Sequence, residues 1–155
     1  MIVYRIAKSK YIKDLSGYGS YLFGGRWTLQ GIHALYTASS RSLAYLEFLV
    51  HQLDRDTWPT NIEISSLDVA AHEEIIQPNV EELPHNWHDL EYHADIQVLG
   101  GNYFRNGQLG LIVPSAIVPD ETNLILNPQH PDYGEVVTIR SVESLRLDER
   151  FSRKI

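Results

Sequence analysis

Cysteine is absent from this sequence of 155 residues. This absence excludes disulfides, thiolate metal sites and a cysteine nucleophile. Apolar runs approaching about 18 residues are also lacking, so no membrane-spanning helix is expected. The N-terminus has neither the charged region nor the long apolar region of a signal peptide. A cytoplasmic location without membrane contact is therefore the default expectation.

Positive charge is scarce. The chain has 13 Lys and Arg against 20 Asp and Glu, which gives a formal net charge of −7. Contacts with phosphate backbones need clustered Lys and Arg, and here the basic residues are scattered singly. We therefore expect no direct nucleic-acid contact, whereas a basic protein partner remains compatible with the acidic charge.

Metal-ligand motifs are missing as well. His85, His88 and His93 follow one another at spacings of three and five, but no His-Glu-x-x-His motif occurs. Histidines that are solvated or hydrogen-bonded explain this pattern better than a metal site does. No metal is expected.

Short apolar segments alternate with turn-rich segments, and the length fits one domain over residues 1–155. Strands are predicted at 2–6, 33–37, 61–67, 109–113, 124–126 and 136–139. Helices are predicted at 42–53, capped by Ser39 or Ser40, and from 89 to about 103, where Gly100 and Gly101 make the end uncertain. Residues 11–31 and 77–86 are predicted to be loops. These elements predict an α+β domain with small mixed sheets and two to four helices.

The first candidate for chemistry is Gly24-Gly25-Arg26-Trp27. Two glycines allow a close approach of backbone to a ligand, and the fork of Arg26 suits a phosphate pair. The motif is not a P-loop, because no Gly-Lys-Ser/Thr follows. The alternative is a turn with a surface arginine stacked on Trp27.

Glu47 is the second candidate, because seven of the eight residues from Leu43 to Val50 are apolar or aromatic. A helix that is apolar nearly all round is largely buried, and a buried carboxylate needs a partner or an opening to solvent. The alternative, Glu47 at a solvated helix edge, fits the sequence equally well.

Ser115 and Tyr36 complete the candidates. Ser115 follows Pro114 at the end of an apolar strand, where ligand-binding residues often lie, although it also fits an ordinary turn or cap residue. No Gly-x-Ser-x-Gly motif surrounds it, which argues against a serine nucleophile. Tyr36 ends a short strand, where its ring fits either stacking on a flat ligand or packing in the core.

The ordered set of these segments resembles the RES domain. It comprises Tyr4-Arg5, Gly24-Gly25-Arg26-Trp27 with Gly31, Tyr36, Ala44 with Glu47, Val113-Pro114-Ser115-Ala116, and Asn123 through Asn127-Pro128. The resemblance covers residues 2 to 140. One departure is Thr28, where the family more often has Asn, so the role of this residue in shaping the loop is open.

The resemblance implies a toxin of a bacterial toxin–antitoxin pair with a fold similar to ADP-ribosyltransferases. It implies cleavage of NAD+ at the nicotinamide–ribose bond without a metal, and neutralisation by an Xre-type helix-turn-helix antitoxin. A homodimer within a larger complex is compatible with it. The implied catalytic residues are Glu47, Arg26, Tyr36 and Ser115. The implied NAD+-binding residues are Arg26, Tyr36, Ser115, Tyr4, Arg5, Gly25 and Trp27.

Two alternatives stay open at this point. A mono-ADP-ribosyltransferase that modifies a protein would use the same motif, because the motif does not encode the acceptor. A non-catalytic binding or interaction module is the second alternative, and the carboxylate of Glu47 in an apolar helix argues against it.

Overall fold

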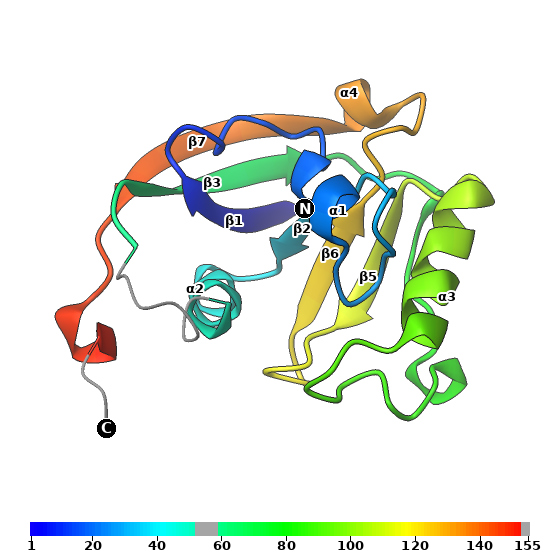
Figure 1. Cartoon of the computed structure of the whole chain (residues 1–155). Helices are drawn as coiled ribbons and strands as arrows, with labels where there is room; N and C mark the ends of the chain where they lie inside the picture. Colours follow the sequence, from blue (N-terminus) through cyan, green and yellow to red (C-terminus); the bar gives the residue numbers. More distant parts are fainter. Residues whose placement is uncertain (52–58, 153–155) are drawn as a thin grey trace.

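Seven strands form one mixed sheet in a computed structural model that describes residues 1–51 and 59–152 (Figure 1). The strands are β1 (Ile2–Lys8), β2 (Leu35–Ala38), β3 (Ile62–Val69), β4 (Ile75–Ile76), β5 (Gly110–Pro114), β6 (Thr122–Leu126) and β7 (Val137–Leu145). Their order across the sheet is β4-β5-β6-β2-β1-β3-β7. Neighbouring strands are antiparallel except for β4 and β5, which are parallel.

The described residues also form four α-helices, α1 (Tyr18–Phe23), α2 (Arg41–Val50), α3 (Ala94–Arg105) and α4 (Tyr133–Val136). Two short 3₁₀ helices, η1 (Val80–Glu82) and η2 (Glu149–Ser152), add to them. The predicted α+β class is confirmed, with one continuous sheet in place of several small ones. Within this part of the chain, no helix has the length and apolar character needed to cross a membrane.

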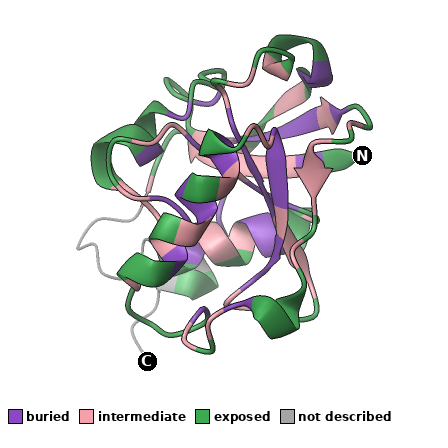
Figure 2. Ribbon diagram, turned by 90° about the vertical axis from the view of Figure 1, so that its right-hand side faces the viewer, coloured by how far each residue is buried: buried purple, intermediate pink, exposed green. Residues whose placement is uncertain are grey.

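The two faces of the sheet bury separate apolar clusters, because successive side chains of a strand point to opposite faces. Val3, Leu35 and Leu67 lie in the cluster on one face. On the other face α2 packs with Ala38, and α3 packs with strands β5 and β6 in a second cluster. Figure 2 shows buried strand segments at the centre and exposed helix surfaces around them.

Helix α2 begins where the sequence predicts. The Oγ of Ser40 accepts a hydrogen bond of 3.0 Å from the backbone N–H of Leu43, which caps the helix. Leu43, Ala44 and Leu49 are buried. The helix is described to Val50, and residues 52 and 53 of the predicted helix lie outside the described residues.

Helix α1 lies within the segment that was predicted to be a loop, so that prediction is wrong for residues 18–23. Two of the glycines that favoured a loop stand at the helix ends, and a third, Gly19, lies within the helix. Gly17 has φ 68° before the helix and Gly24 has φ 69° after it. Both values belong to the left-handed region that glycine adopts at little cost. The glycines therefore delimit this helix instead of preventing it.

Helix α3 starts at Ala94, not at residue 89, and continues through Gly100 and Gly101 to Arg105. A Cβ on Gly100 would overlap the carbonyl oxygen of Trp27. The glycine thus permits contact between the helix and the Gly24–Thr28 loop, and it does not end the helix. Residues 89–93, expected to be helical, connect η1 to α3 without regular structure.

The largest strand difference concerns β7, predicted over 136–139 and observed over Val137–Leu145. It pairs with β3 along its length, with a register irregularity at Ser66 and Leu67. As the edge strand, β7 exposes many polar side chains, and these obscure its strand pattern in the sequence.

We expect Gly100→Ala to destabilise the protein by about 2 kcal/mol, because the added methyl group meets the backbone of Trp27. Gly19→Ala in α1 is the matched control, since outside its chain neighbours and its own helix backbone no atom lies within 4 Å of its added Cβ. Urea unfolding monitored by circular dichroism measures both changes. Equal stabilities of the two variants would contradict this packing.

Candidate active site

Glu47 lies half-buried near the middle of α2. Its Oε1 accepts two hydrogen bonds, one of 2.9 Å from the Oγ of Ser115 and one of 2.6 Å from the Nδ2 of Asn123. Of the two alternatives that the sequence allowed, the half-buried carboxylate with partners is therefore correct. Two donors on one oxygen fix the direction of the carboxylate.

Ser115 is a fully buried residue directly after β5. Its Oγ accepts the backbone N–H groups of Ile117 and Val118, each at 3.1 Å. Because these bonds occupy the hydroxyl oxygen, its proton is directed to Glu47. The turn role that the sequence allowed for Ser115 is therefore confirmed, and its role in ligand binding stays a prediction.

Asn123 reaches Glu47 from β6, where it pairs with Ala38 of β2 and Val113 of β5. Its Oδ1 is buried and has no hydrogen-bond partner within the described residues. In the same part of the chain, only the Oε1 oxygen of Glu47 receives a hydrogen bond. The second carboxylate oxygen of Glu47 therefore has no donor in this part of the chain and can accept a hydrogen bond from a ligand, whereas the amide oxygen of Asn123 is buried.

Arg26 lies on the loop after α1. Its Nη1 donates to the carbonyl oxygens of Trp87 at 2.9 Å and Asp89 at 2.7 Å. Its Cζ lies 5.1 Å from the centroid of the Tyr92 ring. Trp27, the stacking partner considered from the sequence, is buried and instead stacks on Trp87 with ring centroids 6.5 Å apart.

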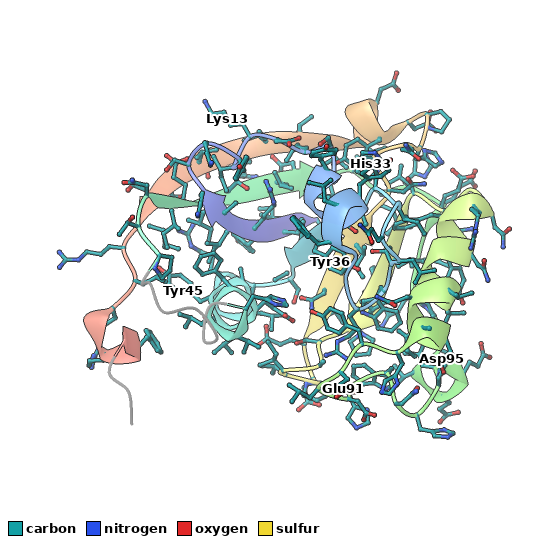
Figure 3. All side chains as sticks on the ribbon, viewed as in Figure 1. Lys13, His33, Tyr36, Tyr45, Glu91 and Asp95 are labelled. Carbon is teal, nitrogen blue, oxygen red and sulfur yellow. The ribbon has the colours of Figure 1, made fainter. Side chains whose placement is uncertain are left out.

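Tyr36 supports the Arg26 loop from β2 (Figure 3). Its hydroxyl oxygen accepts the backbone N–H of Trp27 at 3.1 Å and lies 2.9 Å from the Oγ1 of Thr28. Thr28 Oγ1 in turn lies 2.8 Å from the Oγ of Ser20. The hydroxyl of Thr28 therefore continues the network that shapes the loop, which gives this residue a role despite its departure from the family pattern.

Gly25 leaves no room for a side chain, because a Cβ at this position would overlap the Tyr36 hydroxyl. Its carbonyl oxygen accepts a hydrogen bond of 2.8 Å from Nε2 of Gln97 on α3. The loop is thus held by β2 on one side and by α3 on the other.

Burial and nearby groups shift the pKa values of two tyrosines near Arg26. Burial raises the pKa of Tyr36 to about 12, against the hydrogen bonds from Thr28 and Trp27, which lower it. Burial also raises the pKa of Tyr92, while the charge of Arg26 lowers it and that of Glu47 raises it. Tyr92 therefore lies within the fields of both Arg26 and Glu47.

Tyr4 and Arg5, two of the residues expected to bind NAD+, lie on opposite faces of the sheet, and Tyr4 is on the face that α2 covers. Tyr4 packs against Ala38, Leu43 and Ala44 beneath α2. Arg5 lies on the opposite face of the sheet, where its Nη1 donates to carbonyl oxygens of the following loop and burial lowers the pKa of its guanidinium. Both residues thus have packing or hydrogen-bonding contacts within the fold, and their binding of NAD+ stays a prediction.

Among the described residues, one group has side chains that could hold a metal, namely His72, Glu74 and Asp132. His72 Nε2 lies 3.2 Å from Asp132 Oδ2, and His130 Nε2 lies 2.6 Å from Glu74 Oε2. The Nδ1 atoms of both histidines accept backbone N–H groups. Histidines that bind metals usually donate a hydrogen bond through the second ring nitrogen. The arrangement therefore fits a set of hydrogen bonds within the fold better than it fits a metal site.

Sequence reasoning missed Tyr92, Asn123 and Gln97 as parts of the site. Asn123 belonged to the family resemblance but received no role. Tyr92 lies in the segment from Pro59 to Asp95, which carried no motif. Tyr92 lies beside Arg26 because the guanidinium binds the carbonyl oxygens of Trp87 and Asp89. No pattern in the sequence predicts these two contacts.

The fold and the site together define a small α+β domain with a positioned carboxylate and a guanidinium on a glycine-containing loop. A family model described as the RES domain matches residues 2–148. The chain belongs to this family, which confirms the resemblance found in the sequence.

Several relatives extend over nearly the full chain. A "Toxin Res" from Photorhabdus laumondii is 38% identical over 152 residues, covering 97% of this chain and 96% of the relative. A "Prs ADP-ribosylating toxin" from Sphingobium is 40% identical over 154 residues, covering 96% and 92%. In the M. tuberculosis MbcT-MbcA toxin-antitoxin complex, a chain with 19% identity aligns with a TM-score of 0.75, covering 93% of this chain and 83% of that one. This last comparison shows the same fold.

Alkaline pH should destabilise the protein through Tyr36. Its hydroxyl remains neutral up to a pKa of about 12 in the folded protein, whereas in the unfolded chain it ionises near pH 10. Its contribution is therefore fully present below about pH 10 and is lost as the pH rises from about 10 to about 12. Between pH 8 and 11, the unfolding free energy should fall by about 1 kcal/mol more in the wild type than in Tyr36→Phe.

Chemical denaturation at the two pH values measures this difference. The raised pKa of Tyr133 affects both proteins equally, so its contribution cancels in the comparison. Identical pH dependence in the two proteins would show that the Tyr36 hydroxyl is not held in a buried network.

Proposed function

We propose that this chain is the toxin of a toxin–antitoxin pair and that it consumes NAD+ by cleaving the bond between nicotinamide and ribose. The observation that carries the proposal is the carboxylate of Glu47, which is oriented by two donors through one oxygen and leaves the other free. The names of the relatives support the toxin role.

The chemistry requires a negative charge at a defined place. When the C1′–N bond breaks, its electron pair leaves with nicotinamide and positive charge develops on the ribose. A preorganised carboxylate stabilises such charge more strongly than it stabilises the ground state. Glu47 is proposed to supply it, and Ser115 to hold Glu47 in place. An acceptor oxygen then bonds to C1′ and releases its proton.

The remaining parts of the site suit the rest of the dinucleotide. The Nη1 of Arg26 is engaged by two carbonyl oxygens, and the other N–H groups of its guanidinium are proposed to bind the diphosphate. Gly25 permits close approach of the backbone. Tyr36, whose hydroxyl is fixed in the loop, is proposed to present its ring to nicotinamide.

The second candidate is transfer of ADP-ribose to a protein, and the Sphingobium relative favours it by name. Both reactions break the same bond, so the acceptor distinguishes them. Mass spectrometry of products made from NAD+ in water, in phosphate buffer and with cell extract identifies it. A free ADP-ribose or phosphorylated product supports hydrolysis or phosphorolysis, and a protein adduct supports transfer. A non-catalytic module would release no nicotinamide.

The partner is proposed to be an antitoxin of the Xre type. The acidic chain favours a basic, DNA-binding partner electrostatically. Expression of this chain alone should stop growth and deplete NAD+, and co-expression of the antitoxin should restore both. Growth arrest with an unchanged NAD+ pool would favour protein modification.

Glu47→Gln should lower nicotinamide release at least about 100-fold, because the charge is lost while the shape is kept. Glu63→Gln on β3 is the matched control and should retain wild-type turnover. Liquid chromatography of nicotinamide measures the rates, and circular dichroism checks that both variants fold. Wild-type turnover by a folded Glu47→Gln protein would remove Glu47 from the reaction.

Arg26→Lys should raise the KM for NAD+ and lower kcat, since lysine keeps the charge but loses the planar fork. We expect each parameter to worsen about tenfold, the size of one charged hydrogen bond. Arg140→Lys, at a surface ion pair with Asp68, is the control and should behave as wild type. Unchanged kinetics in Arg26→Lys would show that Arg26 only holds residues 87–89 in place and does not bind NAD+.

A further inference from the structure

Tyr92 lies beside Arg26, and the charge of Glu47 acts on its hydroxyl. Its ring centroid is 5.1 Å from the Cζ of Arg26, and the residue is 45% exposed. Its preceding neighbour, Glu91, is labelled in Figure 3. Tyr92 is therefore a half-exposed aromatic residue that is in contact with one of the two charged groups of the proposed reaction.

The segment that carries Tyr92 is fixed on both sides. Arg26 binds the carbonyl oxygens of Trp87 and Asp89. The Oδ2 of Asp89 lies 2.9 Å from the Nε2 of His93, the residue that precedes α3. A side chain on such a segment is held in place before a ligand binds, which lowers the entropy lost on binding.

The hydroxyl of Tyr92 has no hydrogen-bond partner in the ranges 1–51 and 59–152. By contrast, the hydroxyls of Tyr36 and Tyr133 are bonded to the backbone of Trp27 and Leu15. A buried tyrosine hydroxyl usually finds a partner within the protein, whereas that of a half-exposed residue can be solvated. That of Tyr92 remains able to donate to an anion beside Arg26 or to a ribose oxygen on the side of Glu47.

We propose that Tyr92 is a substrate-positioning residue that acts through two separable parts. Its ring holds the guanidinium of Arg26 in place, and its hydroxyl binds NAD+ between the diphosphate and the nicotinamide ribose. The inference rests on the proposed function. It assigns a role to a segment without a recognisable motif, and it predicts effects on binding that differ from those of Glu47.

The test compares Tyr92→Phe and Tyr92→Ala with Tyr11→Phe as the matched control. Tyr11 is 50% exposed and also has a cation over its ring, Lys10 at 4.6 Å, but it lies beside Arg5 on the other face of the sheet. Tyr92→Phe should raise the KM for NAD+ about tenfold with kcat within about twofold, because one hydrogen bond to a charged or polar ligand group is lost. Tyr92→Ala should raise KM further and also lower kcat, because it removes the aromatic ring that contacts the guanidinium of Arg26. Tyr11→Phe should change neither parameter.

An unchanged KM in Tyr92→Phe, or a fall in kcat alone, would overturn the proposed role of the hydroxyl. Direct calorimetry of NAD+ binding to Glu47→Gln and to Glu47→Gln/Tyr92→Phe separates this result from failure of the proposed reaction. If wild-type protein releases no nicotinamide, the reaction is wrong, and a tenfold weaker Kd in the double variant would still support Tyr92 as a binding residue. Equal affinities, or no binding by either variant, would overturn it.

Discussion

A half-buried carboxylate must be hydrogen-bonded, and this requirement determines how the parts around Glu47 are arranged. Its donors, Ser115 and Asn123, come from the end of β5 and the start of β6, while Glu47 itself comes from α2. Two backbone N–H groups direct the hydroxyl proton of Ser115 to the carboxylate. Helix and sheet are thus joined by a polar contact within apolar surroundings, and one oxygen of Glu47 is left without a donor among the described residues.

The part of the site that contains Arg26 depends on close packing around the short loop from Gly24 to Thr28. Gly25 touches the Tyr36 hydroxyl, and Gly100 brings α3 against the carbonyl of Trp27. Thr28 and Gln97 complete the hydrogen bonds of the loop. With its backbone fixed, the loop presents Arg26 to the segment after Trp87, so that positive charge and the carboxylate of Glu47 act on the same tyrosine, Tyr92.

Local patterns in the sequence predicted much of this arrangement. Alternation and capping placed the central strands and the start of α2, and the apolar surroundings of Glu47 made a half-buried carboxylate with partners one of two equal alternatives. Glycines led to two incorrect expectations, a loop in place of α1 and a possible helix end at Gly100. The sequence does not distinguish a glycine that ends a helix from one that permits close contact. Tyr92 and Asn123 escaped notice because their roles depend on contacts between residues more than 60 positions apart. The separation of Tyr4 and Arg5 onto opposite faces follows from strand geometry, but family resemblance had grouped them.

The proposed reaction requires that the free side of Glu47 faces the nicotinamide ribose of bound NAD+. A crystal structure of the full chain with carba-NAD+, an analogue that resists cleavage, tests it most directly. We expect the nicotinamide-bearing ring to bind with its C1′ beside the carboxylate oxygen that Ser115 and Asn123 leave free, and the diphosphate to bind at Arg26. An analogue bound elsewhere, or with its adenosine end at Glu47, would contradict it.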